Sequence, residues 1–234
     1  MTMKINEVTP RFVMTYEHPF SGVRYIDKRL TSVQWKLFVN MAGPEVSDNP
    51  IEQTKRSSVM YQKLVFFMDT VLNECVITGI GDATDIGHFH NIKVMIPELD
   101  PTDDFILQTL HSKLSTIAGE DMCILQLSLY ASDTGVTYTF TPNGHYDLPL
   151  QEDFIGAEAL HDAPWWARND CDTYDVSKDH EDAEELLQSA RVLADFEEHI
   201  LEVMYGDGSD VDEVANGAPA EIIRVDQWQK PRKV

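Results

Sequence analysis

The strongest constraint on the fold is an apolar segment that the sequence marks as a long and almost fully buried helix. Asn49 followed by Pro50 is a typical helix start, because a capping side chain precedes a residue whose fixed backbone suits the first helical position. Apolar residues then recur every three or four positions, and others widen this stripe as far as Leu72. A helix that is apolar on most sides belongs inside a core. We therefore expect residues 50–72 to form the helix around which the other elements pack.

The elements predicted around this helix are short and of both kinds. They are a helix over 31–41 that a Gly43-Pro44 stop ends, strands over 75–80 and 91–96 joined by a hairpin-length loop, a helix over 102–118, and a hairpin of 122–130 with 136–140. The first part of the chain is thus expected to be rich in helix. This order predicts an α+β fold with a small, mostly antiparallel sheet and helices on one face.

Composition divides the chain into three parts. Residues 1–144 are predicted to form the α+β core domain, and residues 145–206 an acidic helical region docked on that core. Residues 207–234 are predicted to be a flexible acidic linker that ends in a basic tip. Within the second part, residues 179–205 have the apolar stripe of an amphipathic helix, which predicts that this helix docks on the core or on a second copy of itself.

Charge is sharply segregated along the chain. The first 66 residues carry a net of +3, residues 67–223 contain 33 acidic against 5 basic residues, and the last eleven carry +3, so the whole chain has a net charge of −22. Such a field repels nucleic acid and anionic membranes and attracts basic partners. The sequence therefore favours a non-enzymatic interaction protein that binds a basic protein partner.

The predicted helix over 179–205 carries more acid than its folding requires. Like charges four residues apart each cost a few tenths of a kcal/mol, so the acidic side serves either solubility or a partner. If the acidic side serves a partner, the binding surface consists of Glu181, Glu184, Glu185, Asp195, Glu198 and Glu202. Trp165 and Trp166 lie in the preceding acidic stretch, where tryptophan is typical of an interface anchor. The alternative is that these two rings fold back to cover the core.

A metal-dependent enzyme is the rival interpretation from another class. His88 and His90 would point to the same side of an extended chain and could share a metal ion. However, the spacing fixes no third ligand, and the sequence has no nucleophile elbow, phosphate loop or zinc-protease motif. We therefore predict no catalytic residues, no resident metal and no cofactor.

Two nucleic-acid hypotheses follow from the charge pattern. A DNA mimic would use the acidic surface, but the predicted helix has one net charge per ~5 Å of its axis, whereas duplex DNA has one per ~1.7 Å. A single-strand binder would use the N-terminal third, where basic and aromatic residues interleave. The residues concerned are Lys4, Arg11, Arg24, Lys28, Arg29, Lys36, Lys55 and Arg56 among Tyr16, Phe20, Tyr25 and Trp35.

The cysteines and the N-terminus indicate a reducing compartment. Cys75, Cys123 and Cys171 are scattered and odd in number, which argues against a disulfide framework. The N-terminal residues lack the apolar stretch of a signal peptide, and no apolar run is long enough to cross a bilayer. We expect a cytoplasmic protein of the inhibitor, immunity or accessory type, with a bacteriophage origin as one hypothesis.

Overall fold

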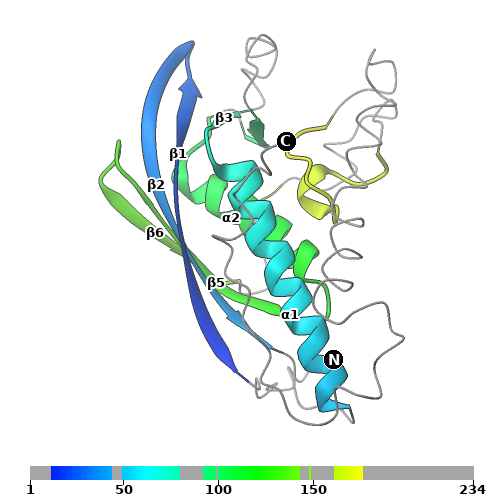
Figure 1. The fold of residues 1–234 in the computed structure, drawn as a ribbon. Helices are drawn as coiled ribbons and strands as arrows, with labels where there is room; N and C mark the ends of the chain where they lie inside the picture. The colour runs from blue at the N-terminus through cyan, green and yellow to red at the C-terminus, as the bar shows by residue number, and fades with distance from the viewer. Residues whose placement is uncertain are drawn as a thin grey trace, which may run out of the picture.

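The computed structural model describes residues 12–43, 49–79, 92–98, 100–142, 148 and 161–175. In chain order, the elements are β1 (Val13–Ile26), β2 (Arg29–Ala42), α1 (Pro50–Phe67), a π-helical turn (Met68–Leu72), β3 (Cys75–Gly79), β4 (Lys93–Ile96), α2 (Asp103–Ala118), β5 (Cys123–Ala131), β6 (Val136–Phe140) and a 3-10 turn (Trp165–Ala167). The strands form one six-stranded sheet in the order β4-β3-β1-β2-β5-β6. Both helices lie on one face of this sheet (Figure 1).

The sheet is mixed and is built on the long hairpin of β1 with β2. These strands pair antiparallel from Val13 opposite Ala42 to Ile26 opposite Arg29. The two turn residues, Asp27 and Lys28, both have positive φ, which matches the twist of a tight hairpin. β2 with β5 and β5 with β6 are also antiparallel, whereas β1 with β3 and β3 with β4 are parallel. The α+β class and the larger antiparallel share are therefore confirmed.

The predicted helix over residues 31–41 is wrong, because this segment is strand β2. Every second residue from Val33 to Met41 is buried, and the residues between them face outward or are half-buried. Side chains of a strand alternate between two faces, so this period of two decides the structure. The helix prediction rested on apolar residues three or four positions apart. A strand that has large apolar side chains on both faces contains the same spacing. The preceding strand β1 was not predicted.

Three other predictions are confirmed. The buried helix predicted over 50–72 is α1 followed by the π-helical turn, and Asn49 caps it by accepting a hydrogen bond from the backbone N–H of Glu52. The helix predicted over 102–118 is α2. The hairpin around the Ser132–Gly135 turn is β5 with β6. Strands β3 and β4 lie where they were expected but run parallel, so they do not form a hairpin.

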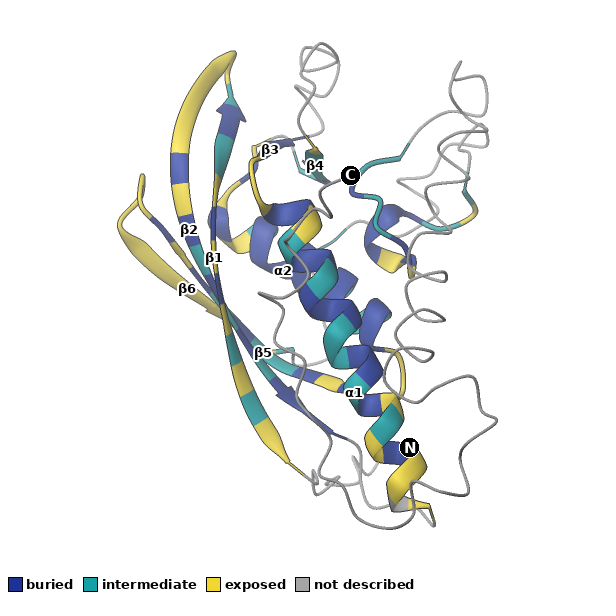
Figure 2. Cartoon of the chain, in the orientation of Figure 1, coloured by how far each residue is buried: buried dark blue, intermediate teal, exposed yellow. Residues whose placement is uncertain are grey.

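The core lies between the sheet and the two helices. On β2, Val33, Leu37 and Val39 are fully buried and belong to one core cluster with buried residues of α1 and α2. The sides of both helices that face the sheet are buried (Figure 2). The predicted acidic helix over 179–205 and the predicted linker lie outside the described residues. Of the second predicted region, the structure describes Leu148 and residues 161–175.

Candidate functional site

Of the predicted partner-binding residues, the structure describes only the two tryptophans. Glu181, Glu184, Glu185, Asp195, Glu198 and Glu202 lie outside the described residues, as do His88 and His90. Trp165 and Trp166 belong to the 3-10 turn, and their exposed fractions are 0% and 4%. Their rings meet edge to face with centroids 5.9 Å apart. The rings therefore cover the core, as the alternative interpretation expected, and neither is exposed to a partner.

A buried lysine of α2 holds this tryptophan segment in place. Lys113 has no exposed surface, and its Nζ donates hydrogen bonds to the carbonyl oxygens of Trp165, at 2.9 Å, and Arg168, at 2.8 Å. Its third hydrogen bond, at 2.7 Å, goes to Oδ1 of Asp170. An ammonium group has three donors, and all three are used here. The cation is thus fully compensated by residues 165–170.

Arg168 extends this pair into an ionic network, here called the Lys113 network. Its Nε lies 2.8 Å from Oδ2 of Asp170, and its terminal nitrogens pair with Asp175 and with Asp172, the latter at 3.4 Å. It also donates a hydrogen bond to the carbonyl oxygen of Ala163 at 3.0 Å. Three of the acidic residues in 161–175 are therefore bound to internal cations. Their charge is used in folding rather than offered to a partner.

The ionisation of this network follows from burial and charge. Burial alone raises the pKa of Asp170, but the cations of Lys113 and Arg168 outweigh burial and bring its pKa below the usual range. Burial lowers the pKa of Lys113, and Asp170 opposes that shift. Cys171 lies beside the network, and burial raises the pKa of its thiol to about 12. This thiol therefore stays protonated and is a poor nucleophile.

A second titratable cluster, which sequence reasoning missed, lies under the sheet at the π-helical turn. The imidazole of His18 on β1 is 2% exposed, and its Nδ1 lies 3.3 Å from Oδ1 of Asp69. Its Nε2 is buried without a hydrogen-bond partner among the described residues. Burial lowers the pKa of His18, although Asp69 and the backbone of Met68 oppose the shift. The ring is therefore uncharged at neutral pH.

Aromatic rings surround this histidine on the inner face of the sheet. His18 stacks between Tyr16 and Phe20, with centroids 6.2 and 5.7 Å away, and Phe20 stacks on Trp35 at 5.2 Å. Tyr61 of α1 meets Tyr16 edge to face. Burial, Asp69 and Tyr61 together raise the pKa of Tyr16 to about 12. A histidine beside a carboxylate can act as a general base only where its free nitrogen reaches a substrate, and here Nε2 is enclosed. The arrangement serves packing.

Of the basic and aromatic residues of the N-terminal third, Lys28, Arg29 and Arg56 are exposed and several others are buried, while Lys4 and Arg11 lie outside the described residues. Arg24 is buried, where it pairs with Asp103 and with Asp133, whose Oδ2 lies 3.1 Å from the arginine Nε. Its guanidinium also lies 5.8 Å from the ring centre of Trp35. This arginine therefore joins β1, the start of α2 and the β5–β6 turn. Phe20, Tyr25 and Trp35 are buried as well, so these rings are not available to stack on nucleotides.

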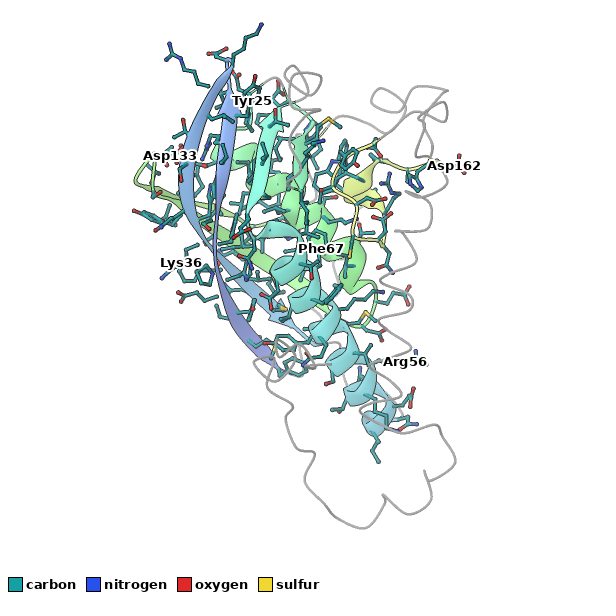
Figure 3. The ribbon with its side chains drawn as sticks, turned by 45° about the horizontal axis from the view of Figure 1, so that its top comes forward. Tyr25, Lys36, Arg56, Phe67, Asp133 and Asp162 are labelled. Atoms are coloured by element: carbon teal, nitrogen blue, oxygen red, sulfur yellow. The ribbon has the colours of Figure 1, made fainter. Side chains whose placement is uncertain are left out.

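A shallow hollow of about 450 Å³ lies along β1 and β2, near the β5–β6 turn. It is lined by Pro19, Phe20, Ser21, Gln34, Trp35, Lys36, Asn73, Tyr130 and Ser132. The ammonium group of Lys36 (Figure 3) lies 2.7 Å from Oε1 of Glu17, so its charge is compensated. Among the described residues, no three His, Cys, Asp or Glu side chains are arranged to hold a metal ion, and no helix is long and apolar enough to cross a membrane.

No protein-family model matches the chain, and no curated protein matches it in sequence.

The Lys113 network predicts a strong effect of a nearly isosteric substitution. Asp170→Asn leaves the buried ammonium of Lys113 without its carboxylate, and breaking a buried pair in this way costs about 3–5 kcal/mol. We expect the free energy of unfolding, measured by urea titration at neutral pH, to fall by that amount. The exposed Glu120→Gln makes the same change of charge and is expected to be nearly neutral. Equal denaturation midpoints for the two variants would contradict this role of the network.

The buried His18 predicts a pH dependence of stability. Because its folded pKa is lowered, the unfolded state binds the proton more tightly, and stability falls as the pH drops below the unfolded value of about 6.5. Each such group contributes at most about 1.4 kcal/mol per pH unit. We expect His18→Gln to flatten the dependence of the unfolding free energy on pH between neutral and mildly acidic conditions.

His111 provides the comparison for this measurement. Burial also lowers its pKa, so His111→Gln is expected to flatten the curve separately and the double variant to flatten it further. If the unfolding free energy of His18→Gln depends on pH as that of the original protein does, the His18 imidazole is not held uncharged in the folded state.

Proposed function

We propose that the protein is a non-enzymatic interaction protein, of the inhibitor, immunity or accessory type, that binds a basic protein partner through the acidic region 145–206. The observation that carries this proposal is the distribution of charge. The described residues contain 16 acidic and 10 basic residues, a net of −6, whereas the whole chain has a net charge of −22. The remaining −16 therefore belongs to other parts of the chain.

The described part of the molecule uses its buried acids internally. Asp103 and Asp133 compensate Arg24, and Asp170 compensates Lys113 and Arg168. Folding of the core thus explains these acids but not the excess in residues 176–223, where 14 acidic residues accompany 2 basic ones. An uncompensated excess of one sign raises the rate at which an oppositely charged protein associates, and screening by salt weakens it over a Debye length of about 8 Å.

The proposed contact residues are the acidic ones of the predicted helix: Glu181, Glu184, Glu185, Asp195, Glu198 and Glu202. Trp165 and Trp166 take a different part in this proposal. Because both rings are buried against the core, their proposed part is to hold residues 165–166 of the acidic region beside α2 rather than to contact the partner. A partner with a basic surface fits this arrangement, and a nucleic acid does not.

Charge reversal tests this proposal. We expect the change of Glu181, Glu184, Glu185, Glu198 and Glu202 to Lys to weaken binding of a purified, captured partner by more than about tenfold. Binding by the original protein should also weaken steeply when salt rises from about 50 to 300 mM. Isothermal titration calorimetry measures both effects.

A matched control separates the acidic region from net charge. Reversal of five exposed acids of the core, Glu17, Glu52, Glu74, Asp104 and Glu120, changes the net charge by the same amount. We expect this variant to bind with less than half of that loss in affinity. Equal losses of binding affinity in the two variants, or an affinity that does not change with salt, would rule out a specific binding surface in the acidic region.

The metal-dependent alternative rests on His88 and His90 and has its own measurement. Stoichiometric zinc, manganese or iron in the purified protein, lost on combining His88→Ala with His90→Ala, would replace the binder with an enzyme as the favoured function. We expect instead that the double variant has the same metal content and the same melting temperature in chelator as the original protein.

A further inference from the structure

The two outer edges of the sheet differ in how they are covered. The segment 161–175 lies along the β4 edge: the backbone N–H of Met95 donates to the carbonyl oxygen of Thr173 at 2.9 Å, and Nε1 of Trp165 donates to the carbonyl oxygen of Met95 at 2.9 Å. The hydroxyl of Thr173 donates to the carbonyl oxygen of Lys93. An uncovered edge offers unpaired backbone groups to other chains, and covering it prevents such pairing.

Strand β6, at the opposite edge, has no such protection among the described residues. It pairs with β5 on one side only, and its sequence is Val-Thr-Tyr-Thr-Phe, without charge or proline. Exposure runs along the strand (Figure 2), with Val136 45% and Tyr138 40% exposed. Proteins usually blunt an exposed edge with lysine, proline or a bulge. Because β-branched and aromatic residues favour strand pairing, this edge is suited to accept another strand.

The sequence of β6 is nearly symmetrical about its central residue. In an antiparallel pair of two β6 strands centred on Tyr138, Thr137 lies opposite Thr139 of the other copy, and Val136 lies opposite Phe140. Hydroxyl side chains then meet on one face of the sheet and apolar side chains on the other, which is the pairing that stabilises strands. The opposed edges also bring no charged side chain of β6 together. In a chain with a net charge of −22, two copies meet less repulsion along an uncharged strand than they would along an acidic one.

We propose that β6 is a self-association edge, where two copies of the chain pair antiparallel about a two-fold axis at Tyr138 and form one continuous sheet. A two-fold interface uses the same surface on both copies, as this symmetry requires. Five residues a side make a small contact, so the dimer is expected to be weak, with a dissociation constant in the micromolar range. This interface is independent of the acidic region that is proposed to bind a basic partner.

Sedimentation velocity over a range of protein concentrations tests the proposal. We expect a monomer–dimer equilibrium whose dissociation constant rises at least tenfold when Val136→Lys is combined with Tyr138→Lys. The control combines Leu30→Lys with Ile51→Lys, two exposed apolar residues elsewhere, 54% and 72% exposed. Both variants reduce the negative charge equally, so general repulsion cannot explain a difference between them. A protein that stays monomeric to millimolar concentration, or equal dissociation constants for the two variants, overturns the proposal.

A cross-link tests the geometry without relying on the lysine variant. Opposed residues of an antiparallel pair have Cα atoms ~4.5–5.5 Å apart, within the range that a disulfide spans. Tyr138→Cys, in a Cys123→Ser background that removes the exposed native thiol, is expected to form a covalent dimer under mild oxidation. Leu30→Cys in the same background is the control. Cross-linking of the control alone, or of neither variant at concentrations where the protein dimerises, excludes β6 as the interface.

Discussion

The arrangement of this molecule depends on the three hydrogen bonds that the buried ammonium group of Lys113 donates. A fully buried cation is unstable without compensation, and α2 itself supplies none to it in the hydrogen bonds that Lys113 makes. The acceptors come from Trp165, Arg168 and Asp170, more than fifty residues further along the chain. Formation of α2 against the sheet therefore requires the segment 161–175 to pack beside it. That packing also buries the two tryptophans and covers the β4 edge.

This requirement separates two uses of acidic residues in one chain. In 161–175, carboxylates compensate Lys113 and Arg168, so their positions are fixed by the fold. Beyond this segment the acids outnumber the bases seven to one over residues 176–223. A charge excess that folding does not consume is free to act on other molecules. In 161–175 the buried cations of Lys113 and Arg168 account for three of the four acidic residues.

The sequence predicted the elements with strong local signals. The helix α1 follows from the Asn49-Pro50 start, α2 from its apolar stripe, and the β5–β6 hairpin from its turn. Strand β2 was mistaken for a helix because its large side chains on both faces imitate helical spacing. The Lys113 network and the His18–Asp69 pair could not be predicted, because their members are distant in sequence and each residue is ordinary by itself. A lone lysine in an amphipathic helix gives no sign that it will be buried.

The same reasoning connects the charge of the chain to its strand edges. Strong net charge keeps copies of a protein apart, which reduces the need to protect every edge of a sheet. The β4 edge is nevertheless covered, because the Lys113 network places 161–175 alongside it. The β6 edge receives no such segment among the described residues, and it lacks the lysine or proline that would blunt it.

Long-range repulsion between the negative charges opposes every approach of two copies, while the short-range attraction of backbone pairing acts only where a strand edge is open. The balance between these two terms depends on ionic strength, because salt screens the repulsion and leaves the backbone hydrogen bonds almost unchanged. Self-association through β6 should therefore strengthen as salt rises, whereas binding of a basic partner should weaken, so the two interfaces respond to the same variable with opposite sign.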